Sequence, residues 1–123
     1  MSVETAIRTT ILSLAPNRVF PDFAPTLILA ETSPEPFITY QVIGGLGRSN
    51  IAQANSLKMY RIQVNCYAKT RIFCSNLAIL VESALNNANL FKAVSLDEPK
   101  STYEDDVNLY GTMQDFSIHY HVN

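Results

Sequence analysis

Two histidines and an aspartate in the last part of the chain have the residue types of a metal site. His119 and His121 stand two positions apart in an expected strand, so their side chains point to one face. Asp115 lies farther along the same face, and two imidazoles with a carboxylate could hold a zinc ion. The competing interpretation is a pair of exposed histidines on the polar face of a strand. We favour it because no third ligand stands at a suitable distance.

A glycine-rich stretch follows the first clear strand, over residues 44–50. It is not a phosphate-binding loop, because such a loop has Gly-Lys-Ser/Thr at the start of a helix and a strand follows here. A dinucleotide fingerprint also fails, because Asn50 stands where a third glycine is required. Long loops without structure of their own are commonly functional. We therefore predict a long, mobile hairpin arm over residues 44–56.

Acidic residues gather around Pro99, namely Asp97, Glu98, Glu104, Asp105 and Asp106. They lack the alternate spacing and central glycine of a calcium loop, so a solvated acidic turn is the better interpretation. No serine or cysteine stands beside a histidine in a familiar nucleophile motif. Cys74 falls inside an apolar stripe, where its thiol would be inert. The sequence thus predicts no catalytic, cofactor-binding or metal-binding residue, and a protein that is not an enzyme.

The arm and the acidic turn together suggest a contact between copies of this chain. The arm carries Leu46 and Ile51, two apolar residues that a monomer has no evident way to bury. Arg48 could pair with the acidic turn of a neighbouring copy, which would fix the register of the contact. The hypothetical oligomer interface therefore comprises Leu46, Arg48, Ile51, Glu104, Asp105 and Asp106.

The composition is that of one folded domain over residues 1–123. Hydrophobic residues make up 47% of the 123 residues and charged residues 16%, enough for one packed core. The net charge of −2 does not indicate a nucleic-acid binder, although a ring that lets DNA slide through would need no basic patch. No apolar run approaches the ~20 residues of a membrane span, and no signal peptide is evident. Cys66 and Cys74 suggest folding in a reducing cytoplasm with two buried thiols.

Hydrophobic periodicity predicts the elements that would position these residues. Apolar residues recur at helical spacing over residues 2–15 and 71–88, with Ser2 and Thr70 as their N-caps. Alternation of apolar and polar residues predicts strands over residues 37–43, 57–69, 91–96 and 112–122, with a short further strand over residues 26–30.

This order of elements predicts an α+β fold, with a mainly antiparallel sheet of about four to five strands and two helices packed on one face. The alternation over residues 57–69 suits a sheet that is covered on one side only. The expected core places Ile62, Val64, Phe116 and Ile118 of the sheet against Ile7, Ile11, Leu77 and Val81 of the helices. The apolar stripe of the second helix also includes Phe73, Cys74, Leu80, Ala84 and Leu85.

Several segments carry a family resemblance by their order along the chain. They are residues 3–14 (VETAIRTTILSL), 18–21 (RVFP), 36–42 (PFITYQV), 61–68 (RIQVNCYA), 103–106 (YEDD) and 115–120 (DFSIHY). The strand over residues 61–68 leads directly into a helix rich in alanine and leucine. In this order they resemble the tail completion proteins of long-tailed bacteriophages, also called tail-terminator or tail-to-head joining proteins.

The resemblance implies a subunit that forms a ring, expected to be six-fold, at the head-proximal end of the tail tube. Such a ring ends tail polymerisation and joins the tail to the head. The implied partners are other copies of the chain, the tail tube protein and the head-tail connector protein, with no cofactor, membrane or sequence-specific nucleic acid. The implied location is the neck region of the virion tail, after assembly in the host cytoplasm. The alternatives are a small α+β metabolic enzyme subunit, a ligand-binding module, or another head-tail neck protein.

Overall fold

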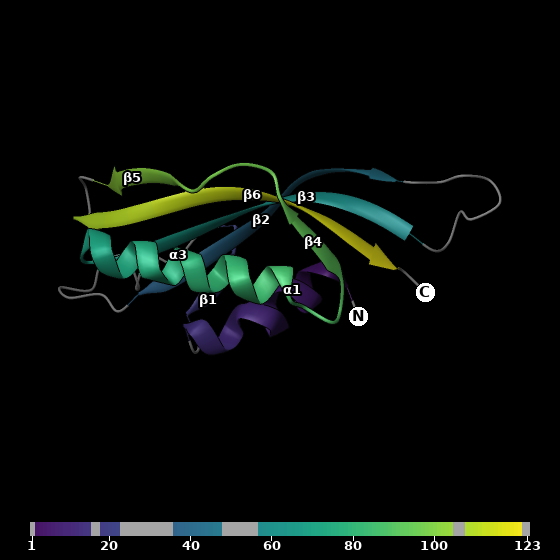
Figure 1. Ribbon diagram of the computed structural model, residues 1–123, viewed down its shortest axis with the longest axis horizontal. Coiled ribbons are helices and arrows are strands. Elements are labelled where there is room, and N and C mark those ends of the chain that lie inside the picture. The colour runs from purple at the N-terminus through teal and green to yellow at the C-terminus, as the bar shows by residue number, and fades with distance from the viewer. Residues whose placement is uncertain (1, 16–17, 23–35, 48–56, 105–107, 122–123) are drawn as a thin grey trace.

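The computed structural model describes residues 2–15, 18–22, 36–47, 57–104 and 108–121 (Figure 1). Its helices are α1 (Val3–Ile11), the 3-10 turn η1 (Leu12–Leu14) and α3 (Arg71–Asn86). Its strands are β1 (Val19–Pro21), β2 (Phe37–Gly47), β3 (Leu57–Ala68), β4 (Lys92–Ser95), β5 (Lys100–Glu104) and β6 (Leu109–His121). The strand predicted over residues 26–30 lies outside the described residues.

The described strands form one six-stranded sheet in the order β1-β2-β3-β6-β4, and β5 also pairs with β6. β1 pairs with β2 in parallel, whereas the other pairs are antiparallel. The α+β class and the mainly antiparallel sheet are as predicted, but the sheet has six strands instead of about four to five and includes one parallel pair. β1 has only three residues and ends in proline, and β5 is exposed at nearly every position. Neither strand therefore has an alternating apolar pattern that the sequence could reveal.

Both predicted N-caps start their helices. The Ser2 hydroxyl accepts a hydrogen bond from the Thr5 backbone N–H at 3.1 Å, and Thr70 Oγ1 accepts one from Phe73 N–H at 3.2 Å. Each hydroxyl satisfies a backbone donor that has no partner within the first turn. The two caps therefore fix where α1 and α3 begin.

The main core lies between the two helices and one face of the sheet. α1 and α3 lie on the same side of the sheet (Figure 1), and their buried residues join the inward side chains of β2, β3 and β6 in one cluster. Every residue of the predicted core is buried in it: Ile7, Ile11, Ile62, Val64, Leu77, Val81, Phe116 and Ile118. The sheet faces predicted from the period-2 alternation are therefore correct at these positions.

The buried stripe of α3 is narrower than predicted. Phe73 is 54% exposed and Leu80 is 52% exposed, although both were expected in the core. Helical geometry places each of them about 80–100° around the helix from Val81, which lies near the centre of the buried face. The buried residues of α3 are Cys74, Leu77, Ala78, Val81 and Leu85.

The opposite face of the sheet is also partly covered, contrary to the expectation of one covered side. Phe37 and Leu109 are buried there, with Phe20 and Tyr67 packed against them. The Phe37 and Tyr67 rings stack with their centroids 4.9 Å apart. β1 brings Phe20 to this face. Because the sequence does not predict β1, it does not predict a second cluster.

Candidate assembly surface

β2 and β3 form a long hairpin whose far half projects beyond the two helices (Figure 1). Residues 44–47 pair with residues 58–61 beyond a β-bulge at residues 42–44. Gly44 has a φ of 156°, which favours glycine and suits the change of strand direction at the bulge. The beginning of the predicted arm is therefore paired strand and not loop. The rest of the arm, residues 48–56, lies outside the described residues.

The two halves of the hypothetical interface lie at opposite ends of the sheet. Leu46 pairs with Met59, and Met59 pairs with His119 near the end of β6. Glu104 is exposed and pairs with Leu109 at the start of β6. At ~3.4 Å per residue, the two ends are roughly 34 Å apart along β6. A contact between them needs a second copy and stays a prediction. The other proposed interface residues, Arg48, Ile51, Asp105 and Asp106, lie outside the described residues.

Each side of the sheet has an outer edge that no other strand of the described residues covers. On one side, β1 pairs only with Ile38 to Tyr40 of β2, which leaves the later part of β2 open. On the other side, β4 and β5 pair with successive parts of β6. β2 and β6 are both antiparallel to β3, and β4 and β5 are antiparallel to β6. The two outer edges therefore run in opposite directions.

The carboxylate of Asp115 is held by an arginine and is not free to bind a metal. Arg61 donates to Asp115 Oδ2 from Nη2 at 2.7 Å and from Nε at 3.2 Å. Asp115 is only 8% exposed, and His119 lies four residues farther on, ~14 Å away along the strand. The part of the chain that the structure describes contains no cluster of three possible ligands, and the side chain of His121 is outside it. The zinc interpretation gains no support.

A polar network fixes the corner between β4 and β5, and the sequence did not indicate it. Asp97 Oδ1 accepts a hydrogen bond from the Asp115 backbone N–H at 3.1 Å. Gln114 Nε2 donates to the Asp97 carbonyl at 3.0 Å and to Glu82 Oε2 at 2.8 Å. The same Glu82 oxygen accepts a hydrogen bond from the Ser95 hydroxyl at 2.7 Å. Asp97 is thus part of a structural network, not only of a solvated acidic turn.

Arg71 ties the first turn of α3 to two strands. Its guanidinium donates to the Gly111 carbonyl at 2.9 Å and to the Thr102 carbonyl at 2.6 Å. It also lies 5.2 Å from the centre of the Tyr110 ring, within cation–π range. The side chain therefore holds β5 on the end of β6. A lone arginine after an N-cap gives no sequence signal for such a contact.

The two cysteines are buried, as predicted. Cys74 is 0% exposed and donates from Sγ to the Cys66 carbonyl at 3.2 Å. Burial raises the pKa of Cys66 to about 12, and it also raises the pKa of Cys74. Because the thiolate is the reactive form, neither thiol has the properties of a nucleophile at neutral pH.

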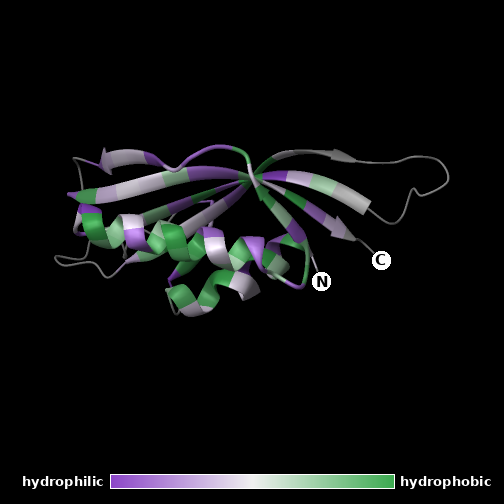
Figure 2. Ribbon diagram, viewed as in Figure 1, coloured by the Kyte–Doolittle hydropathy of each residue, from purple (hydrophilic) through white to green (hydrophobic). Residues whose placement is uncertain are grey.

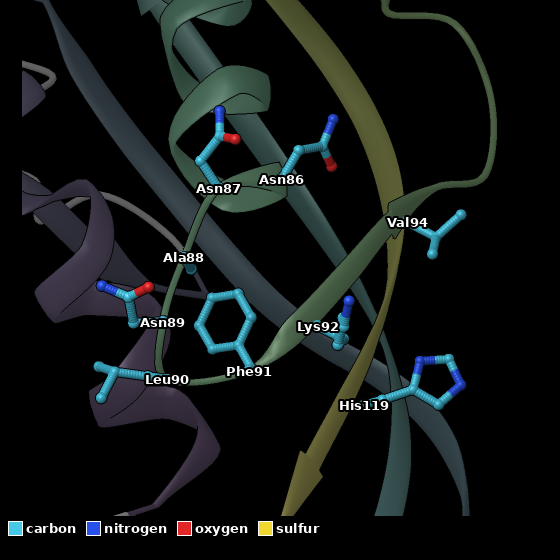
Figure 3. Close-up of a pocket in the computed structure, with 9 residues that line it drawn as sticks. All are labelled: Asn86, Asn87, Ala88, Asn89, Leu90, Phe91, Lys92, Val94 and His119. Atoms are coloured by element: carbon cyan, nitrogen blue, oxygen red, sulfur yellow. The ribbon is translucent and has the colours of Figure 1, made fainter.

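A cavity of about 720 Å³ opens beside the C-terminal end of α3 and is lined by residues 86–92, Val94 and His119 (Figure 3). Asn86 and Asn87 lie at the end of the helix, whereas His119 lies across the cavity on β6 (Figure 3). These polar groups do not converge on one point, as they do in a typical small-molecule site. The cavity therefore supports neither the enzyme alternative nor the ligand-binding alternative.

Comparisons with known proteins bear on the fold. None of the described helices is long and apolar enough to cross a membrane. The chain matches no protein family model and no curated protein. It is similar in structure to a solved chain of the "Virion of native gene transfer agent (GTA) particle", with a TM-score of 0.68 and 12% sequence identity. The likeness covers 98% of this chain and 95% of that one, so the two share a fold over almost their whole lengths.

Proposed function

We propose that this protein is a structural subunit of a phage-like virion, and that it is a tail completion protein. In this proposal, copies form a ring at the head-proximal end of the tail tube, stop its polymerisation and join the tail to the head. The subunit contacts the tail tube protein and the head-tail connector, acts in the neck of the virion and catalyses no reaction.

The observation that carries this proposal is the structural likeness to a virion chain over 98% of the sequence. Virion subunits act by assembly, and the open edges of β2 and of the β4/β5 side could support contacts with another chain. The ordered sequence segments that resemble tail completion proteins provide the more specific assignment within the virion.

The two open edges suggest how a ring could close. Because β2 and the β4/β5 edge run in opposite directions, β2 of one copy could pair antiparallel with β4 or β5 of the next. Such a contact joins two different surfaces, and it closes into a ring when the rotation between neighbours divides a full turn.

In this ring, the hairpin of β2 and β3 would contact the neighbouring subunit. The start of the arm and Glu104 lie at opposite ends of one sheet. When two copies pair side by side without an offset, Arg48 of one copy and the acidic turn of the next are therefore far apart along the strand direction. A pairing of Arg48 with Glu104, Asp105 and Asp106 therefore requires neighbours that are offset along the strand direction. Arg48→Glu alone or Glu104→Lys alone should weaken assembly. The double variant, which exchanges the two charges, should restore it.

Tail morphology in a host that produces the particle tests the function directly. Without this protein, we expect tails of irregular length that do not join heads, and purified protein added to tail tubes should form rings at one end. Tails of normal length that fail only to join heads would instead indicate another neck protein. A protein that stays monomeric with tail tubes and whose loss leaves the particles intact would contradict the proposal.

Deletion of residues 46–53 tests the role of the arm. We expect the deletion to abolish rings and yield abnormal tails, because it removes the last two residues of β2 and six further residues of the predicted arm. The double variant Leu46→Ser and Ile51→Ser keeps the length of the arm and removes only its two large apolar side chains, so it should also weaken ring formation if those side chains make the contact. If the deleted protein still forms rings and gives tails of normal length joined to heads, the arm is not an assembly element.

A further inference from the structure

The outward face of α3 carries an apolar surface that the core does not use. Ile72 is 76% exposed, Phe73 54%, Ile79 62% and Leu80 52%, and hydrophobic residues follow the helix over most of its length (Figure 2). Ile72 and Ile79 lie about 160–180° around the helix from Val81. Phe73 and Leu80 lie about 80–100° from Val81, on one flank of the buried stripe. We call these four residues the α3 outer face. Large apolar side chains clustered on one surface indicate an interaction site.

No charged group of α3 lies on this outer face. The only charged residues of the helix are Arg71 and Glu82, and both are engaged with the strands. Arg71 donates to the Gly111 and Thr102 carbonyls, and Glu82 accepts hydrogen bonds from Ser95 and Gln114. A neutral surface can meet an identical surface without the repulsion that two copies of a charged face would have. The α3 outer face is therefore compatible with pairing to a second copy.

The spacing of the outer face is symmetric about one polar residue. Asn76 is exposed, Ile72 and Phe73 stand four and three positions before it, and Ile79 and Leu80 stand three and four positions after it. A contact with two-fold symmetry requires this property, because residue i must meet residue j while j meets i. An antiparallel helix pair centred on Asn76 satisfies it at every position.

We propose that two copies of this protein pair through antiparallel α3 helices, with a two-fold axis at Asn76. Ile72 of each copy then packs beside Leu80 of the other, and Phe73 packs beside Ile79. The two Asn76 side chains face each other across the axis. Each carboxamide has both a donor and an acceptor, so the pair can exchange hydrogen bonds and fix the register.

The size of the outer face implies a weak and reversible pair. Four partly exposed large side chains offer roughly 400 Å² of apolar surface per copy, within the range of a functional patch on a monomer. A standard stable interface buries about 800 Å² per partner. The pairing should therefore depend on protein concentration. It leaves both strand edges open, so it is separate from ring formation and does not rest on the proposed function.

Disulfide crosslinking locates the proposed axis. Helices whose axes are about 8–10 Å apart bring the two Cα atoms at position 76 to about 3.4–5.4 Å, which overlaps the disulfide range. We expect oxidised Asn76→Cys protein to give covalent dimers. Ser83→Cys is the matched control, because it is exposed on the same helix but lies about 21 Å from its own copy in the antiparallel pair. Cys66 and Cys74 are buried and should not contribute under native conditions.

Sedimentation equilibrium of the unmodified chain measures the pairing itself. The average mass should rise from that of one 13.7 kDa chain toward twice that value with concentration. Ile79→Lys should remain monomeric over the same range with an unchanged melting temperature, because Ile79 is exposed. Deletion of residues 46–53 should leave the dimer intact even if it abolishes rings. Equal crosslinking of Asn76→Cys and Ser83→Cys, or a wild-type chain monomeric throughout, would overturn the proposal and assign the face to a different partner.

Discussion

Arg71 shows how much one side chain can do for the position of a whole strand. β5 has little buried surface of its own, since most of its residues are exposed. Its attachment to β6 therefore relies on the strand ladder and on the guanidinium of Arg71, which bonds the Thr102 and Gly111 carbonyls. Charge-assisted hydrogen bonds of this kind are stronger than neutral ones.

We expect Arg71→Ala to lower the free energy of unfolding by about 1–3 kcal/mol, because it leaves two carbonyls without this donor and removes the contact with Tyr110. Urea denaturation followed by circular dichroism measures the change. Lys92→Ala removes an exposed positive charge on β4 and should change stability by less than about 0.5 kcal/mol. Equal effects of the two substitutions would show that the Arg71 contacts contribute nothing specific.

The buried thiol of Cys66 makes stability depend on pH in the alkaline range. Its pKa is raised from the ordinary 9.0 to about 12, so the folded protein keeps a proton that the unfolded chain releases. The resulting stabilisation is complete below pH 9 and is lost as the pH rises toward 12. The free energy of unfolding should fall by up to about 1.4 kcal/mol per pH unit in this window.

Urea denaturation at several pH values between about 8 and about 11 tests this expectation. Cys66→Ala should have a shallower slope than the wild type, because one titrating group is removed. Part of the slope should persist, because burial also raises the pKa of Cys74 and of Tyr67. An identical slope in the variant would mean that Cys66 does not titrate differently in the folded and unfolded states.

The long elements of this fold could be predicted from sequence because their apolar patterns are regular. β3 alternates over residues 60–66 and β6 over residues 115–120, and α1 and α3 begin at hydroxyl caps, so the eight residues of the predicted core could be assigned to their faces from the sequence. β1 and β5 could not be predicted, because they are held by pairing and by Arg71 and not by an apolar face of their own. The breadth of the α3 stripe was misjudged because periodicity shows which residues are apolar but not how much of the helix is covered.

The register of β3 and β6 places Ile118 in the centre of the core. It is 0% exposed, so Ile118→Ala should cost about 2–5 kcal/mol through lost burial and a remaining cavity. Val94 on β4 is 54% exposed, and Val94→Ala should change the melting temperature by little. Thermal unfolding of both variants compares the core position with the exposed position. A Ile118→Ala melting temperature within a degree or so of the wild type would contradict the assigned core.

The side chain of Thr102 on β5 leaves no room for a Cβ atom at Gly111 of β6. A Cβ atom at this position would lie 2.5 Å from Thr102 Oγ1 and 3.1 Å from the Tyr67 ring. We expect Gly111→Ala to cost about 1–3 kcal/mol, because β5 must shift to accommodate the methyl group. Thr102→Ala should restore part of this loss in the double variant, since it removes the nearest atom. Additive effects in a double-mutant cycle would show that the two positions do not compete for space.

At the scale of the whole molecule, the hypothetical interface was the hardest part to predict. Contacts between copies do not appear in the hydrophobic pattern of one chain unless they leave apolar residues exposed. Leu46 and Ile51 are candidates for that reason. The structure adds a clearer case in α3, where Phe73 and Leu80 belong to the predicted apolar stripe but are exposed. To tell a core residue of α3 from an exposed apolar one requires the positions of α1 and the sheet. The local sequence pattern does not contain these positions.

The corner between β4 and β5 has a consequence for the solubility of the free subunit. It divides the outer edge along β6 into one segment of four residues and another of five. Fibril-forming contacts commonly need six or seven consecutive residues that stack as identical strands. The Asp97 network interrupts the edge between the two segments, and each of them includes a lysine. A subunit stored at high concentration before assembly would thus have an edge that can pair with a specific partner but resists amyloid growth.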